Sequence, residues 1–346
     1  MDKKDEIILQ QLETIRTMTE RNLRSMGGDF WGTPFENVTG APEKKHASKD
    51  GGGKPAAAQP AEKKADEPEP LPKENLADLQ AELDSYIGLA DVKEEVKNLI
   101  NMVNVYKLRR AHDLPTTDMS LHMVFTGNPG TGKTMMARMM ARIYRSLDIL
   151  SKGQLVEVDR SGLVAGYVGQ TALKTQKVIE KAMGGVLFID EAYALNGKSE
   201  NDFGQEAIDT ILKAMEDHRD DLVVIVAGYT DLMEKFIHSN PGLESRFNRF
   251  LLFEDYSPDE MLAIFRMQCK KGCYQLAEGT EELVRDYINE ENGDPETFGN
   301  ARGVRNCFEH ILVAQNNRLA AMESVTKDDL MTIIPDDVLY ARGKLD

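Results

Sequence analysis

One short segment carries residues whose types and spacing suit the binding of a phosphate chain. It reads Gly127-Asn128-Pro129-Gly130-Thr131-Gly132-Lys133-Thr134, the full Walker A pattern. The glycines let backbone N–H groups turn towards an anion, Lys133 places a cation on the β- and γ-phosphates, and the Thr134 hydroxyl ligates Mg²⁺. The segment follows an apolar stretch and opens a predicted helix over residues 135–144, so the phosphates would meet a helix N-terminus. A Gly-rich turn without function is the alternative to this phosphate site.

Two adjacent acids follow a second apolar stretch further along the chain. Val186–Ile189 predicts a buried strand, and Asp190 and Glu191 come directly after it. Desolvating two neighbouring carboxylates is costly, so their position indicates a nearby cation or reacting water. We assign Asp190 to orienting Mg²⁺ or its water, and Glu191 to the base that polarises the attacking water. The alternative is that these acids only cap the element that follows.

The elements that must position these residues alternate between strand and helix. A helix is predicted over Ala90–Ala111, and later helical segments lie near residues 257–270, 279–291 and 300–322. Apolar runs that predict strands are Leu121–Phe125, Leu155–Val158, Val186–Ile189 and Leu222–Ala227. Strands and helices in alternation specify a parallel sheet covered on both faces. We therefore predict an α/β nucleotide-binding domain over residues 79–253, followed by a small, mainly helical domain over 254–346 that has no strands.

The N-terminal part has a different composition. Residues 1–26 predict a short amphipathic helix, because Ile8, Leu12, Ile15 and Met18 recur at three- and four-residue spacing. The helix is either frayed in isolation or a docking element. Residues 27–78 mix Gly, Pro, Ala, Lys and Glu, a composition that cannot bury enough surface to offset its ordering entropy. We predict a disordered tether there.

The overall composition limits the partners and the compartment. The formal net charge of -16 disfavours nucleic-acid binding over the whole surface, although a local basic groove remains compatible with it. Three cysteines are too few for a disulfide framework. No apolar run has the length of a signal sequence core or of a bilayer-spanning helix. These features predict a soluble, cytoplasmic protein.

Four further segments carry a family resemblance. They are Gly184–Tyr193, Asp202–Ala207, Ala227–Tyr229 and Asn240–Phe247. With the two motifs above, they resemble the CbxX/CfqX branch of the AAA+ ATPases. This branch contains stage V sporulation protein K, the red-type Rubisco activase and the ATPases of type VII secretion. The resemblance covers about residues 83–340. The motifs are shared across the branch and do not separate its members.

The resemblance implies a ring, expected to be a hexamer, that binds ATP and Mg²⁺ at its subunit boundaries. Such a ring needs an arginine that reaches the neighbouring subunit's site and stabilises charge on the transferred phosphoryl group. Arg246 is the candidate by position, and Arg249 is the second. Without the resemblance, both would be interpreted as exposed arginines at a helix end.

The resemblance also implies further residues around the nucleotide. A polar sensor is expected where the strand Leu222–Ala227 ends, and here Thr230 or Tyr229 must serve. Arg302, in preference to Arg305, matches the second sensor, whose arginine contacts the γ-phosphate from the lid. Ile87 and Gly88 match the segment that packs on adenine.

One loop is placed where rings of this family face their central pore. Tyr167-Val168-Gly169 offers an aromatic residue, a β-branched residue and a glycine, the kind of loop that grips polypeptide without reading its sequence. The alternative is a surface tyrosine in a turn. DNA motors would more often offer Lys or Arg in this loop.

The function predicted from these residues is an ATP hydrolase that remodels or threads a protein partner through its ring. Two alternatives remain: an assembly scaffold regulated by ATP, and a nucleic-acid motor. The negative charge and the tyrosine loop disfavour the motor. The sequence leaves the identity of the protein partner open.

Overall fold

The computed structural model describes residues 71–117, 120–167, 169–197 and 202–344. The predicted N-terminal helix of residues 1–26 lies outside the described residues, as do Val168 and the predicted tether up to residue 70.

A five-stranded sheet forms the centre of the first domain. Its strands are β1 (Met123–Thr126), β2 (Leu155–Val158), β3 (Val186–Ile189), β4 (Val223–Gly228) and β5 (Phe250–Leu252). Their order across the sheet is β2-β3-β4-β1-β5, and all four pairings are parallel. The carboxyl ends of the strands therefore meet at one edge, where ligands bind in open parallel sheets.

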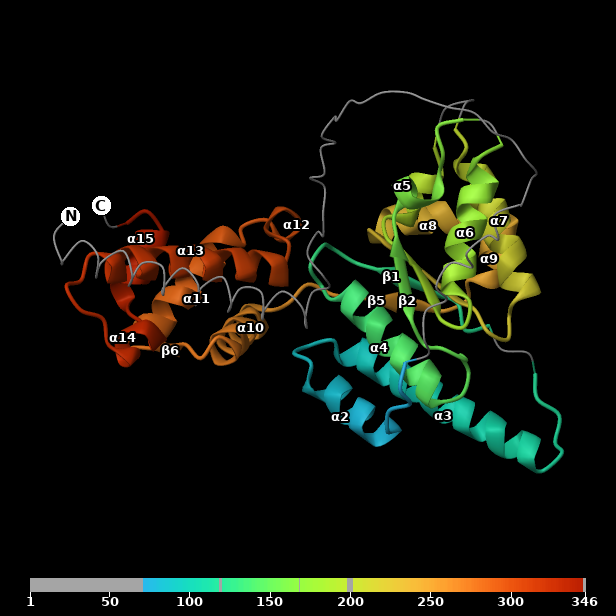
Figure 1. Cartoon of the computed structure of the whole chain (residues 1–346), viewed down its shortest axis with the longest axis horizontal. Coiled ribbons are helices and arrows are strands. Elements are labelled where there is room, and N and C mark those ends of the chain that lie inside the picture. The colour runs from blue at the N-terminus through green and yellow to red at the C-terminus, as the bar shows by residue number, and fades with distance from the viewer. Residues whose placement is uncertain (1–70, 118–119, 168, 198–201, 345–346) are drawn as a thin grey trace, which may run out of the picture.

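Helices cover both faces of this sheet (Figure 1). They are α2 (Leu76–Ser85), α3 (Ala90–Ala111), α4 (Lys133–Ser146), α5 (Arg160–Leu163), α6 (Thr171–Ala182), the 3₁₀ turn η1 (Ala192–Leu195), α7 (Gly204–Asp217), α8 (Thr230–His238) and α9 (Pro241–Arg246). Helices α2, α3 and α4 pack on one face, where Phe125 and Phe188 point. Helices α6 to α9 pack on the other, where Val124 and Leu187 point. The alternation of neighbouring strand residues between two cores explains why β1, β3 and β4 are buried along their whole length.

An ion-pair clamp attaches the start of the described chain to the first core. The guanidinium of Arg142 on α4 donates to both Glu74 and Glu82, at distances from 2.6 to 2.7 Å. These bonds lower the pKa of both carboxyls. A backbone bond from Leu71 N–H to the Lys152 carbonyl, 2.9 Å long, adds a second attachment.

The second domain is mainly helical and has its own core. Its helices are α10 (Pro258–Lys271), α11 (Thr280–Glu291), α12 (Pro295–Phe298), α13 (Ala301–Ala320), α14 (Lys327–Met331) and α15 (Pro335–Ala341). Phe265 and Phe308 meet edge to face in this core, with ring centroids 5.4 Å apart. Among the described residues, no helix is both long and apolar enough to cross a membrane.

The structure confirms the predicted fold class and corrects two details. The helix Ala90–Ala111 has the predicted bounds, and the four predicted strands are present within two residues at each end. The prediction that strands stop after Phe253 is wrong, because β6 (Gln275–Leu276) and β7 (Thr332–Ile333) form a small parallel pair in the second domain. Strand β5 was also missed. Strands of two or three residues are too short to produce a periodic pattern.

Candidate active site

The Walker A segment forms a loop between β1 and α4 at the carboxyl edge of the sheet. Gly127 and Gly132 have φ values of +140° and +99°, which residues with a Cβ rarely adopt. At Gly127 a Cβ would also lie 2.2 Å from the carbonyl oxygen of Phe253. The loop therefore requires glycine at both positions. The hydroxyl of Thr131 donates to the Asn128 carbonyl at 2.8 Å, a hydrogen bond within the loop that stabilises its turn.

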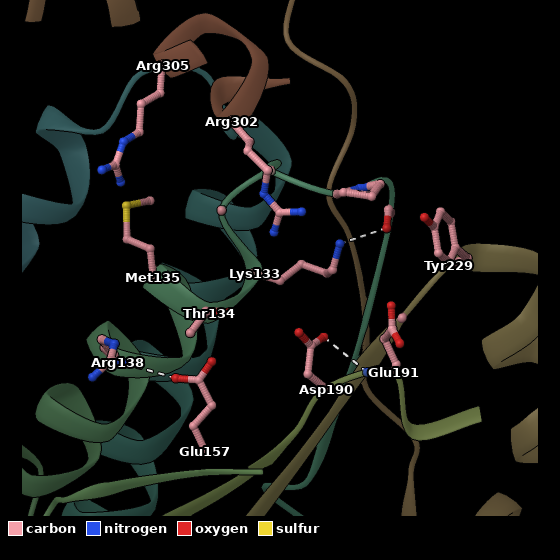
Figure 2. A pocket seen from close by; sticks show the side chains of 15 residues that line it. Lys133, Thr134, Met135, Arg138, Glu157, Asp190, Glu191, Tyr229, Arg302 and Arg305 are labelled. Carbon is pink, nitrogen blue, oxygen red and sulfur yellow. Dashed lines mark hydrogen bonds and ion pairs between the residues drawn. The ribbon is translucent and has the colours of Figure 1, made fainter. Parts of the chain in front are cut away.

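A cavity of about 450 Å³ lies against this loop (Figure 2). It is lined by Gly127, Pro129, Gly130, Gly132, Lys133, Thr134, Met135, Arg138, Glu157, Asp190, Glu191, Gly228, Tyr229, Arg302 and Arg305. Most of the predicted nucleotide residues thus face one cavity, although they come from the ends of strands β1, β3 and β4, from helix α4 and from the second domain. Asn128 and Thr131 belong to the loop, and their side chains bond within the protein.

Lys133 is held in this cavity as a partly desolvated cation. Its Nζ donates to the carbonyls of Gly127 and Asn128, both at 2.7 Å. Burial lowers the pKa of Lys133 to about 8, an effect that the nearby carboxylate of Asp190 opposes. A buried ammonium with few compensating charges gains most from an anionic ligand. The geometry therefore suits a phosphate group.

Asp190 and Glu191 follow β3 and lie opposite Lys133 (Figure 2). Asp190 Oδ1 accepts a bond from the Glu191 N–H at 3.1 Å. Glu191 has a φ of +48°, the left-handed conformation that is costly for a residue with a Cβ. This turn points the two neighbouring carboxylates in different directions, so Asp190 and Glu191 can take separate roles.

An aromatic pair packs beside Glu191. Tyr193 donates to the Glu191 carboxylate, and burial together with that acid raises the pKa of Tyr193 to about 12. Its ring lies against Gly228, where a Cβ would be 2.7 Å from the ring. The ring of Tyr229 lies 6.2 Å away. Tyr229 lines the cavity, whereas Thr230 is exposed at the first position of α8 and does not. Of the two sensor candidates, only Tyr229 faces the nucleotide cavity.

The donor set in the cavity fits Mg²⁺. Thr134 and Asp190 supply a hydroxyl and a carboxylate from adjacent walls. Within the described ranges there is no group of three His, Cys, Asp or Glu side chains that would hold a metal alone. Mg²⁺ usually takes one or two protein oxygens and completes its shell with phosphate oxygens and water. The two predicted ligands match this arrangement.

Sequence reasoning missed one ion pair in the cavity wall. Glu157 on β2 accepts a bond from Arg138 on α4 at 2.9 Å. Burial raises the pKa of Glu157, and the charge of Asp190 adds to the rise. The available signal was a single acid within the apolar run of Leu155–Val158.

A second cavity of about 250 Å³ adjoins the first through Met135. Tyr86, Ile87, Tyr256 and Ala301 also line it. Gly88 does not line it, but its φ of +64° turns the chain there, and its backbone approaches the Tyr256 ring. A mainly apolar slot beside a phosphate site suits a nucleobase.

The second domain contributes two arginines to the phosphate cavity, Arg302 and Arg305, both from α13. Arg302 extends towards Lys133 in Figure 2, whereas Arg305 lies beyond Met135. Arg305 is also engaged, since its Nε donates to Glu309 at 2.8 Å. Arg302 is therefore better placed to contact a bound phosphate.

Arg246 and Arg249 do not line this cavity. The Arg246 guanidinium makes only long contacts, to the Gly242 carbonyl at 3.4 Å and to Glu216 at 3.5 Å. Among the described residues, its Nε has no hydrogen-bond partner. Arg249, in contrast, donates to the Ser120 carbonyl at 3.1 Å. Arg246 is the less committed of the two to contacts within its own chain.

The predicted substrate loop follows α5. The side chain of Tyr167 is 74% exposed, and Gly169 has a φ of +75° with open space around it. Val168 lies outside the described residues. The tyrosine is thus available to an external partner.

Comparison with known proteins gives family matches over both domains. The model of the ATPase family associated with various cellular activities (AAA) matches residues 123–255. The model of the AAA lid domain matches residues 257–345. A CfxQ homolog from Guillardia theta is 44% identical over 274 residues, which are 78% of this chain and 93% of that protein.

Two other relatives have more specific names. The chloroplastic ribulose bisphosphate carboxylase/oxygenase activase of Cyanidioschyzon merolae is 44% identical, over 78% of this chain and 92% of that protein. Stage V sporulation protein K of Bacillus subtilis is 40% identical, over 76% of this chain and 82% of that protein.

A solved structure supports the fold alone. The AAA domain of FIGL-1 superposes with a TM-score of 0.53 at 17% identity, over 76% of this chain and 83% of that one.

Proposed function

The chain belongs to the AAA family of ATPases, in the branch of CfxQ, CbxX and stage V sporulation protein K, and from this premise we propose that it is an ATP-driven protein remodeller. It is an ATP hydrolase by family. We propose further that it works as a ring, expected to be a hexamer, that acts on a protein partner.

The observation that carries the hydrolytic assignment is the meeting of the loop lysine and the two acids across one cavity. Lys133 and the loop amides bind the β- and γ-phosphates, with adenine in the slot beside Ile87. Thr134 and Asp190 would hold Mg²⁺, which would supply positive charge to the phosphates during hydrolysis. Glu191 accepts a proton from the attacking water.

Two further residues complete the proposed site, Tyr229 and Arg302. Tyr229 lies on the wall near Glu191 and orients the water, a role that Thr230 could fill only by leaving the exposed start of α8. Arg302, which extends into the cavity from the second domain (Figure 2), would contact the γ-phosphate. Each of these assignments places a polar group where charge forms during phosphoryl transfer.

Ring assembly would explain the arginine whose guanidinium makes only long contacts with the described residues of its own chain. Arg246 lies outside its own nucleotide cavity and has weak internal contacts. The side chain of Arg246 is 30% exposed, so its terminal guanidinium nitrogens can reach a phosphate supplied by a neighbouring subunit. This supports Arg246 as the residue that acts across the boundary, with Arg249 as a structural neighbour.

The exposed tyrosine supports a polypeptide as the substrate. Tyr167 offers a large apolar side chain beside a glycine with open space around it. Such a side chain grips varied sequences, because its contact is apolar and needs no matching hydrogen bonds. Two relatives carry names that involve a protein partner or a cellular process, the activase of ribulose bisphosphate carboxylase/oxygenase and the sporulation protein. Of the two, the activase is named for its action on an enzyme, which is itself a protein.

Two variants separate remodelling from scaffolding. The first, Glu191→Gln, should abolish both ATP turnover and remodelling. The second, Tyr167→Ala, should keep basal turnover but lose stimulation by a protein partner, measured as phosphate release with and without proteins trapped by the Glu191→Gln form. If Tyr167→Ala supports full stimulation and full partner release, the loop does not grip the substrate and the scaffold becomes the better assignment.

A further inference from the structure

The phosphate loop contacts two segments that are distant from it in sequence. They are the hinge after β5, at Asp255 and Tyr256, and the start of α13, at Gly299 and Asn300. The loop and the second domain touch through their backbones at Gly130. A Cβ on Gly130 would lie 2.0 Å from the Gly299 carbonyl oxygen, and the Ala301 N–H donates to the Gly130 carbonyl at 3.3 Å.

Asn300 lies at the centre of this junction and is 0% exposed. Its Nδ2 donates to Asp255 Oδ1 at 2.8 Å and to the Pro129 carbonyl at 3.3 Å. Its Oδ1 accepts from the Tyr256 N–H at 2.9 Å. Both amide protons and the amide oxygen are therefore used. Its φ of +54° combined with a ψ of -126° lies outside the left-handed region that asparagine tolerates, and it persists only where surrounding contacts impose it.

Asp255 links Asn300 to the phosphate loop. Asn128 Nδ2 donates to both carboxylate oxygens, at 3.0 Å to Oδ1 and 2.9 Å to Oδ2, so Oδ1 accepts from Asn128 and Asn300 together. One carboxylate thus joins an amide of the loop to an amide of the second domain. We call Asn128, Asp255 and Asn300 the lid clasp. Hydrogen bonds to an ionised acceptor are stronger than neutral ones, so the clasp resists separation of the two domains at this point.

We propose that the lid clasp positions Arg302 over the bound triphosphate, which makes Asp255 and Asn300 positioning residues for the nucleotide site. Arg302 follows Asn300 by two residues and lines the same cavity as Lys133. The loop that binds the phosphates is therefore joined to the helix that carries the arginine. The inference rests on the proposed ATPase site and adds how that site is coupled to the second domain.

The variant Asn300→Gly tests the clasp without a change of charge. Glycine adopts the observed φ freely, so the substitution removes the amide and not the backbone conformation. We expect affinity for the analogue ATPγS to fall about tenfold relative to affinity for ADP, the order expected for losing a hydrogen bond to a charged group. ADP lacks the γ-phosphate, so its affinity reports the rest of the site. Fluorescent nucleotide displacement measures both.

A double-mutant cycle shows whether the effect acts through Arg302. Arg302→Ala alone should lower the same ATPγS preference, and Asn300→Gly should then add almost nothing. A positional exchange provides a second route if Asn300→Gly folds poorly. Asn128→Asp should lose the preference, because two carboxylates then face each other. Asn128→Asp combined with Asp255→Asn restores complementary donors and acceptors and should recover it.

Glu254→Gln is the matched control, since it removes an exposed hinge carboxylate next to Asp255 and should keep the preference. The clasp proposal is overturned if Asn300→Gly keeps the ATPγS preference. It is equally overturned if the loss of ATPγS preference in Asn300→Gly adds in full to the loss in Arg302→Ala. It is also overturned if Asn128→Asp combined with Asp255→Asn does not recover the preference. A wild-type chain that binds ADP and ATPγS but cleaves no ATP would instead remove the proposed hydrolytic function and leave the clasp standing.

Discussion

Acidification should destabilise this protein through one buried imidazole. His122 precedes β1, is 7% exposed, and its Nδ1 accepts the Val224 N–H of the adjacent strand at 3.0 Å. Phe247 packs against its ring, with centroids 6.2 Å apart. Burial, with a smaller contribution from the Arg246 charge, lowers the pKa of His122 from 6.5 to about 4. The folded protein therefore keeps this ring neutral.

The sign and size of the effect follow from linkage. Between pH 6.5 and about 4, the unfolded chain binds a proton at His122 that the folded chain does not. The contribution to stability is thus fully present above pH 6.5 and is lost as the pH falls towards 4. At pH 5 these two pKa values correspond to a loss of about 2 kcal/mol, since one pKa unit is about 1.4 kcal/mol.

Urea unfolding at pH 7 and pH 5, followed by circular dichroism, measures this loss. The variant His122→Asn places an amide oxygen where Nδ1 accepts and cannot be protonated in this range, so it should lose about 2 kcal/mol less than wild type between the two pH values. His112→Asn removes an exposed imidazole and should follow wild type. Equal losses in wild type and His122→Asn would refute the assignment.

Three further predictions concern the nucleotide site. Lys133→Ala should lower ATP affinity by about 100-fold or more, because it removes the cation from the phosphate cavity; unchanged binding in a displacement assay would contradict the phosphate role. Glu191→Gln should bind ATP normally and release phosphate about 100-fold more slowly; normal turnover would reassign the base. Arg246→Ala should bind ATP and lose turnover, and mixing it with Lys133→Ala subunits should restore part of the phosphate release. No rescue in the mixture would show that Arg246 does not act across an interface.

The sequence predicted well those features whose functional residues are neighbours in the chain. A phosphate loop needs its glycines, lysine and threonine next to one another, and the acid pair follows its strand directly. Four of the five strands of the central sheet were also predicted, because strands buried on both faces, such as β1, β3 and β4, give apolar runs. These signals require no knowledge of tertiary contacts.

The features that sequence missed depend on long-range contacts. Asn128, Asp255 and Asn300 are polar residues with no spacing pattern between them, and only the fold brings their side chains together. The ion pair of Glu157 and Arg138 likewise joins a strand to a helix. The choice between Tyr229 and Thr230 depends on the direction in which the chain leaves β4, because that direction decides which side chain faces the cavity. A sequence pattern does not contain this information.

The clamp around Arg142 has a mechanical consequence. Arg142 belongs to α4, the helix whose first residue is Lys133, and it binds Glu74 close to the start of the described chain. Any load applied to the segment before Leu71 is therefore borne first by two charged side chains and one backbone bond on the core domain. Through these contacts Leu71 and Glu74 are attached to the core domain and to the helix that begins with the phosphate-binding lysine.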